Sequence, residues 1–162
     1  MTTTIDGSLG ITFPSGTNPQ AAPSKVLQVV NATYSTQVST TGSTQIATGL
    51  TASITPLFST SKILVIVCQN GCYDGGSVYA GLNITVLRNS TTLISTVSMG
   101  NTGNGTGAQY MTPAHYTYLD SPTTTSSTTY STQFGMQSGG AGTVYVQNGN
   151  QTSTITLMEI AQ

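Results

Sequence analysis

The sequence predicts an all-β protein, an antiparallel β-sandwich of the jelly-roll type with an extended N-terminal arm. Three observations lead to this fold class. Thr and Tyr are abundant, and their branched or flat side chains pack well on a pleated surface. Short apolar or alternating segments follow one another with turn residues between them, so that about eight to eleven strands are expected. No segment shows the periodicity of an amphipathic helix.

Residues 1–24 are predicted to form the arm and residues 25–162 the sandwich. Pro14, Pro19 and Pro23, together with several glycines, break both helices and central strands in the first segment. The first strong strand signal, VLQVV, follows Lys25. We therefore expect the arm to act as a docking segment or a linker.

The strand pattern is clearest in the middle and at the end of the sandwich. The run 62–68 (KILVIVC) is continuously apolar from Ile63 onward, as expected for a strand that is covered on both faces. Residues 80–88 alternate, and Ile84 is expected to point into the core. Further strands are expected at 26–30, 92–97, 130–136, 144–146 and 153–160, and loops at 101–109, 121–129 and 137–142.

Charged residues are scarce, and this limits the function classes. The chain has three Lys+Arg, four Asp+Glu and one His, so that 4% of it is charged, against about 25% in ordinary domains. Lys25, Lys62 and Arg88 are too few to neutralise a phosphate backbone, so no nucleic-acid partner is expected. The longest apolar run is far shorter than the roughly 20 residues of a membrane span. We predict a structural or adhesive protein and no enzyme.

Cys68 and Cys72 could close a small disulfide across a turn or remain free thiols. The N-terminus lacks a basic start and an apolar stretch, which indicates synthesis in a cytoplasm, where thiols stay reduced. The free state is therefore favoured. No metal site and no cofactor are predicted, because a zinc site needs about four ligands and His115 is the only histidine.

No catalytic residue is assigned. A nucleophile–histidine–acid arrangement around His115 lacks the G-x-S-x-G elbow, and a structural or subunit-contact role is favoured for this residue. The enzyme alternative, a sugar-cleaving depolymerase, needs two carboxylates such as Asp120 and Glu159 to share a cleft. Nothing in the sequence places these two together, and Asp120-Ser121-Pro122 is interpreted as a turn.

Five tyrosines are candidates for subunit or ligand contacts, because tyrosine offers rigid apolar area and a hydroxyl group. They are expected in loops and are Tyr73, Tyr79, Tyr110, Tyr116 and Tyr118. Packing in the core or at strand edges is an equally good interpretation of the same residues.

Several segments resemble a β-sandwich module of bacteriophage virions that is often found at the C-terminal end of tail-fibre proteins. They are YLDSP (118–122), TTY (128–130), GTVYV (142–146), STITLMEI (153–160), SKILV (61–65) and VLRNST (86–91). The arm segment GITFPSGT (10–17), with Gln20 after it, is similar to the G-I-T-F-x-D-G-T-x-Q segment that precedes such modules. It departs from that segment by Ser15 in place of the acidic residue and by Pro19. The resemblance implies a trimeric, non-enzymatic domain on the virion surface, with Ile11 and Phe13 in the docking arm.

Two functions remain open within this resemblance. The short arm and the lack of stalk repeats favour a capsid decoration (cement) protein. The alternative is a tail-fibre or receptor-binding tip that contacts a host surface glycan. The expected partners are further copies of the chain, as a homotrimer, and other virion proteins such as major capsid or tail proteins. A secreted adhesin is a further alternative from a different class.

Overall fold

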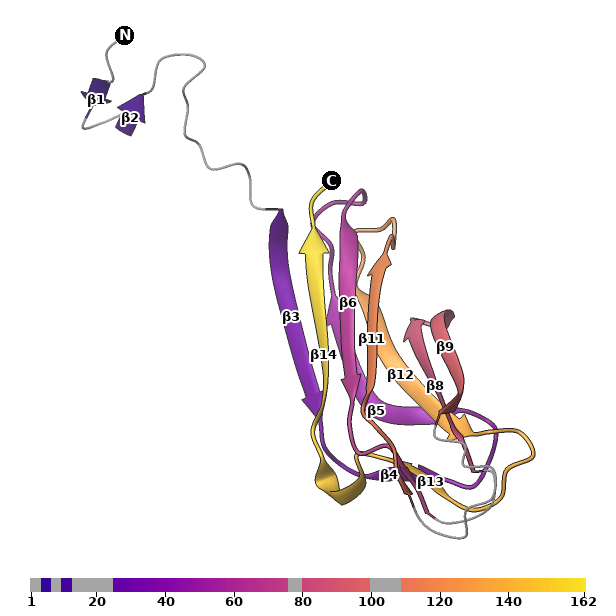
Figure 1. The fold of residues 1–162 in the computed structure, drawn as a ribbon. Helices are drawn as coiled ribbons and strands as arrows, with labels where there is room; N and C mark the ends of the chain where they lie inside the picture. The colour runs from indigo at the N-terminus through magenta and orange to yellow at the C-terminus, as the bar shows by residue number, and fades with distance from the viewer. Residues whose placement is uncertain (1–3, 7–9, 13–24, 76–79, 100–108) are drawn as a thin grey trace.

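Two four-stranded antiparallel sheets pack face to face in the computed structural model (Figure 1). The structure describes residues 4–6, 10–12, 25–75, 80–99 and 109–162. The first sheet, here called the β6 sheet, has the strand order β11-β6-β14-β3, and the second, the β12 sheet, has the order β5-β12-β8-β9. Their strands are β3 (Val26–Tyr34), β5 (Ile46–Ile54), β6 (Lys62–Gln69), β8 (Leu82–Arg88), β9 (Thr91–Met99), β11 (Ala114–Asp120), β12 (Thr128–Met136) and β14 (Ser153–Ile160).

The pairing of these strands identifies a jelly roll. Strand β3 pairs with β14, β5 with β12, β6 with β11, and β8 with β9. The chain therefore folds back on itself as a ribbon, first strand against last, and successive pairs alternate between the two sheets. This arrangement is the double-sheet jelly roll, which confirms the predicted fold class.

Apolar side chains alternate along the strands and fill the space between the sheets. One cluster lies around Val65, Tyr130 and Leu157, and a second around Ile84 and Phe134. All five of these side chains are buried. Because the side-chain period of a strand is two, the intervening residues lie on the outer faces.

A chain of buried hydrogen bonds crosses the core between polar residues of both sheets. Thr48 and Thr132 share a hydrogen bond of 2.5 Å, and Thr132 Oγ1 donates to Gln69 Oε1 at 3.0 Å. Gln69 Nε2 donates to Ser153 Oγ at 2.9 Å, and Gln147 Nε2 donates to the same oxygen at 3.2 Å. Since buried polar groups are costly without partners, this network favours the register in which all five meet.

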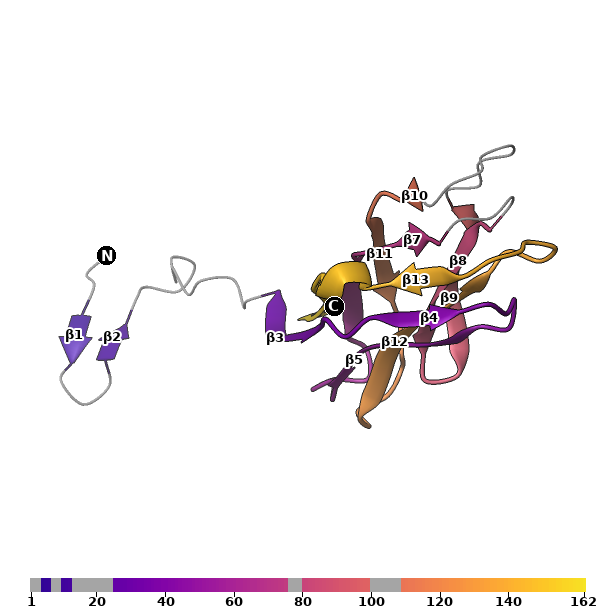
Figure 2. The same ribbon diagram turned by 90° about the horizontal axis from the view of Figure 1, so that it is seen from below.

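A small sheet covers one end of the sandwich. Its order is β10-β7-β13-β4, with β4 at Val38–Thr40, β7 at Tyr73–Asp74, β10 at Gln109–Tyr110 and β13 at Val144–Val146. Figure 2 shows β4, β13 and β7 side by side across this end. Val144 and Val146 point inward and are buried, whereas Tyr145 is only half-buried. A short 3-10 helix, η1 (Asn148–Asn150), leads into β14.

In the predicted arm, β1 (Thr4–Asp6) and β2 (Gly10–Thr12) pair as an antiparallel hairpin and pair with no other described strand. Ile5 is the register partner of Ile11. Phe13 lies outside the described residues. Within the described part of the chain, no helix has the length and apolarity needed to cross a membrane.

Most of the predicted strands are found, but two long ones were missed. The predicted strands 144–146 and 153–160 match β13 and β14, whereas β12 begins at Thr128, inside a predicted loop. Strands β5 and β11 were not predicted, and the described residues alone form fourteen strands where about eight to eleven were expected. Strand β5 was not predicted because Thr, Ser and the central Gly49 interrupt its apolar positions.

Gly49 has a positive φ of 89° where the register of β5 against β12 shifts. A Cβ at this position would lie 2.3 Å from the ring of Tyr34. We expect Gly49→Ala to lower the free energy of unfolding by about 3 kcal/mol, since backbone strain adds to the clash. Gly139→Ala is the matched control, because φ is 81° there and nothing lies within 4 Å of the new Cβ. Chemical denaturation that gives equal losses for both variants would contradict the clash.

Candidate functional site

Two of the predicted contact tyrosines belong to the small sheet. Tyr73 and Tyr110 are direct register partners on β7 and β10, so both lie in strands and not in loops as predicted. Their segments are too short to show alternation in the sequence. The side chain of Tyr110, and Tyr79 altogether, lie outside the described residues.

Tyr145, which the sequence analysis did not single out, stands beside Tyr73. The two residues are register partners, and their ring centroids are 5.5 Å apart with the planes tilted by 53°. A Cβ on Gly75 would lie 2.7 Å from Tyr145 Cε2, so the glycine leaves room for this ring. The sequence pattern that could have identified Tyr145 is its place between Val144 and Val146. Because the two valines face the core, the tyrosine between them points to the outer face.

The other candidates, on β11, are divided between the two faces of the β6 sheet. Tyr116 packs against both apolar clusters, and burial raises the pKa of its hydroxyl, although a hydrogen bond with Thr96 partly offsets this. His115 is exposed on the opposite face, and Tyr118 is exposed at the edge of the sheet. These residues therefore form a strand and not the predicted loop, because His, Tyr, Thr and Leu suit a pleated edge.

A shallow hollow of about 300 Å³ lies next to β11. Its lining residues are Thr96, Pro113, Ala114, His115 and Tyr116. Among the residues that the structure describes, no carboxylate lines this hollow, so none of them orients the His115 ring there.

Cys68 and Cys72 are free thiols in the structure. Cys68 lies on the outer face of β6, where its Sγ is 3.9 Å from His115 Nε2 and 3.3 Å from Asn70 Oδ1. Cys72 is buried, and burial raises the pKa of its thiol to about 11. A thiol that stays protonated at neutral pH is a weak nucleophile. Among the described residues, no three His, Cys, Asp or Glu side chains gather as a metal site.

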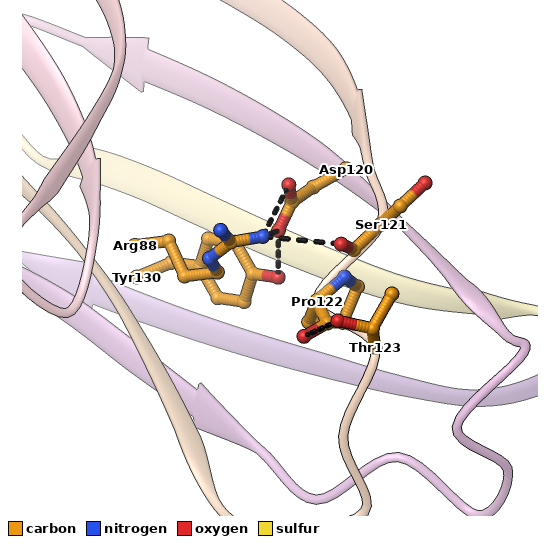
Figure 3. Close-up of polar contacts among 6 residues, drawn as sticks. All are labelled: Arg88, Asp120, Ser121, Pro122, Thr123 and Tyr130. Atoms are coloured by element: carbon orange, nitrogen blue, oxygen red, sulfur yellow. Dashed lines mark hydrogen bonds and ion pairs between the residues drawn. The ribbon is translucent and has the colours of Figure 1, made fainter.

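Asp120 is the last residue of β11 and not part of a turn as predicted. Its carboxylate accepts hydrogen bonds from Arg88 Nη1 at 2.8 and 2.9 Å and from the Tyr130 hydroxyl at 2.7 Å (Figure 3). Burial, and then the hydrogen bond to Asp120, raise the pKa of the Tyr130 hydroxyl. The cluster joins β11 of one sheet to β8 and β12 of the other.

Glu159 carries a second set of structural contacts, at the same end of the sandwich. Its carboxylate accepts from Gln28 Nε2 at 2.6 Å and from the backbone amides of Leu57 and Phe58 at 2.8 and 3.4 Å. Burial alone would raise the pKa of this carboxyl, but the hydrogen bonds outweigh burial and hold the pKa below its usual value. The carboxylate therefore fixes the connection between β5 and β6.

This lowered pKa makes stability depend on pH. A carboxyl whose folded pKa is depressed stabilises the fold above its unfolded pKa of about 4.3, and this contribution is lost as pH falls through the folded pKa. We expect the melting temperature to fall between about pH 5 and pH 3, and to fall less in Glu159→Gln than in the wild type. Thermal melts of both proteins across this range test it, and equal slopes would contradict the role of Glu159.

The two carboxylates that the enzyme alternative requires lie close together in the β6 sheet, on either side of the same residue. Both Asp120 and Glu159 are register partners of Ile63, so they flank it on the inner face. No sequence pattern indicates this proximity, because the register across three strands decides it. Each carboxylate is covered and already holds several hydrogen bonds, so neither faces an open cleft.

The outer face of the β6 sheet carries a continuous apolar row. Leu119, Leu64, Met158 and Val29 are successive register partners across β11, β6, β14 and β3. The two ends of the row are the most exposed, with 50% for Leu119 and 55% for Val29.

Two further rows follow on the same face. They contain Thr117, Ile66, Thr156 and Asn31, and then His115, Cys68, Thr154 and Thr33. None of the three rows contains a Lys, Arg, Asp or Glu. Together they form a neutral surface, here called the outer β6 face.

Comparison with known proteins gives matches among solved structures alone. No protein-family model matches the chain, and no curated protein does. The chain is similar to the VP2 subviral particle of infectious bursal disease virus, with 16% identity, a TM-score of 0.41 and 83% of this chain covered. It is similar to the structure of the Gx strain of that virus, with 17% identity, a TM-score of 0.43 and 83% of this chain covered. It is also similar to a mutant VP2 in derived T=1 particles, with 17% identity, a TM-score of 0.44 and 92% of this chain covered.

The chain spans about two fifths of the length of these viral chains, with 38%, 37% and 41% of them covered. The jelly-roll assignment rests on the strand order described above.

Proposed function

We propose that this chain is a non-enzymatic structural protein of a virion surface, assembled as a homotrimer and acting as a capsid decoration protein. The observation that carries the proposal is the outer β6 face, a broad surface without charged side chains and with an exposed apolar row. Contact through such a face desolvates no ion, and the penalty for burying charges is avoided. The bacteriophage assignment within this proposal comes from the sequence resemblance.

The two ends of the sandwich suit different contacts. Strand β3 begins and β14 ends at the same end (Figure 1), and Leu57 and Phe58 are exposed there, by 59% and 56%. An arm that precedes β3 would leave the sandwich at this end and dock on the particle. The small sheet with Tyr145 lies at the opposite end, so it would face outward.

Antibody labelling of intact virions in negative-stain images tests the location. Label spread over the head is expected for a decoration protein, and label confined to the tail would contradict it. A particle that lacks the protein, as the control, should show neither label.

The tyrosine pair favours a second candidate, a receptor-binding tip of a tail fibre. Tyr73 and Tyr145 offer two half-buried rings on the outward end, and aromatic rings with hydroxyl tips suit contacts with sugars. Binding to a host-surface glycan that is lost in Tyr145→Ala, but kept in Tyr118→Ala, would support this function. Absence of binding in the wild type would leave decoration as the better proposal.

The depolymerase alternative receives no support from the contacts of Asp120 and Glu159, because both carboxylates hold the fold together. Incubation of the wild-type protein with host capsular polysaccharide, followed by size analysis of the polymer, tests this directly. Shortened chains would overturn the non-enzymatic proposal. Variants of Asp120 are unsuitable for this test, because loss of folding would imitate loss of activity.

A further inference from the structure

We infer that the outer β6 face is the surface through which three copies of the chain pack around a threefold axis, with Leu119 of one copy against Val29 of the next. The inference rests on the homotrimer proposed above and names the surface that would form it.

The chemistry of the face suits contact with further copies of itself. A surface that meets its own copies must avoid like charges, since opposed like charges are destabilising. The three rows contain no Lys, Arg, Asp or Glu, so like charges do not oppose each other within them. Lys62, the register partner of Ile160, lies just outside these rows at the first residue of β6. The first row is apolar across all four strands of the sheet. Burial of its exposed apolar surface would therefore give the most favourable free energy of association on this face.

The positions of Val29 and Leu119 favour a closed ring. These two residues are the most exposed of the row and lie on β3 and β11, the two opposite edges of the sheet. A head-to-tail contact joins two different patches, and it closes into a ring when the rotation fits. Contact between the β3 edge of one copy and the β11 edge of the next is a head-to-tail contact of this kind.

The width of the sheet fits a threefold ring. Four strands at about 4.8 Å spacing are about 19 Å wide, and three such sheets that form a triangular prism lie about 5 Å from its axis. Packed sheets lie about 10 Å apart, so each contributes a side-chain layer of about 5 Å. Three outer β6 faces would therefore enclose a filled interior, in which the apolar row forms one layer.

The area of the face argues against a simple pair. Seven residues of β11 span about 23 Å, so the face covers about 440 Å² per copy, which is below the roughly 800 Å² per partner of a stable pair. A ring adds contacts that a face-to-face pair lacks, because it also brings the β3 and β11 edges together.

Engineered disulfides test the inference. In one chain, β3 and β11 are three strand spacings apart, about 14 Å, and a disulfide requires Cα atoms within about 7 Å. The variant Val29→Cys/Leu119→Cys, in a Cys68→Ser background, can therefore form this disulfide only between chains. We expect oxidation to give covalent trimers on non-reducing gels, which revert to single chains on reduction.

Each other outcome contradicts a defined part of the argument. Covalent dimers alone would overturn the threefold arrangement. A trimer in light scattering without cross-linking would overturn this interface and leave the proposed homotrimer standing. A monomer in light scattering at micromolar concentration would overturn both.

A charge substitution provides an independent readout. We expect Leu119→Lys to convert the trimer to monomers at micromolar concentration, because each of the three seams would then bury a lysine charge against the apolar Val29 of the next copy. The matched control is Ile46→Lys, which changes an exposed apolar residue on the other sheet and should leave the trimer intact. Equal dissociation in both variants, or in neither, would contradict the inference, and circular dichroism checks that both remain folded.

Discussion

Ile84→Asp is expected to leave the domain largely unfolded under conditions in which the wild type is folded. Ile84 is fully buried in β8, between its register partners Phe134 and Thr96. The substitution removes buried aliphatic surface and places a carboxylate where no partner is available. The expected loss is on the order of 5 kcal/mol, which is comparable with the whole stability of many domains. Urea denaturation followed by circular dichroism measures it.

Thr92→Asp is the control for this prediction. It introduces the same side chain at an exposed position of β9, the strand that pairs with β8. A surface change of this kind is expected to alter stability by about 0.5 kcal/mol or less. If Ile84→Asp remains as stable as the control, the inward register of β8 described here is wrong.

Asp120→Ala is expected to lower the free energy of unfolding by about 3 kcal/mol. The change leaves the Arg88 guanidinium and the buried Tyr130 hydroxyl without the acceptor that both use. The Arg88 side chain is 26% exposed, so water compensates part of its loss, and the lower end of the range for a broken buried ion pair applies. Chemical denaturation of the variant and the wild type provides the comparison.

A combined variant separates the ion pair from the general effect of a mutation in the core. In Arg88→Met/Asp120→Leu/Tyr130→Phe, every polar side chain of the cluster is replaced. The remaining partner, the Ser121 carbonyl oxygen that accepts from Arg88 Nη1 at 3.3 Å, belongs to an exposed residue. We expect this protein to be more stable than Asp120→Ala alone. The opposite order would indicate that packing around β11, and not the unpaired Arg88 and Tyr130, determines the loss.

The parts of the fold that could be predicted are the strands whose own sequence shows an apolar run or an alternation of apolar and polar residues. Both the run 62–68 and the alternation of 153–160 indicate strands that are found, and 153–160 also shows its burial pattern directly. The continuous run wrongly predicts cover on both faces of β6, whose outer residues such as Ile66 are exposed. Strand β5 carries Thr48 and Gly49 where apolar residues are expected, because Thr48 belongs to the buried hydrogen-bond network. That network depends on partners far away in the sequence, so no local pattern could reveal it.

The candidate site was less predictable, because register across several strands creates it. Leu119, Leu64, Met158 and Val29 are separate outward positions in the sequence, and they form a row only when three register relations are known. Asp120 and Glu159 meet around Ile63 for the same reason. The tyrosines were correctly singled out as an unusual set, but their division between the core, an edge and the small sheet depends on the fold.

The pairing of β3 with β14 also determines when the outer β6 face can form during synthesis of the chain. The first and last strands of the roll lie next to each other, and this pairing supplies half of the outer β6 face. Contacts between strands so distant in the chain form slowly, because a long loop must close first. The row that ends at Val29 therefore cannot exist on a nascent chain before β14 has left the ribosome. Association through the complete face can therefore begin only after all four of its strands have been synthesised.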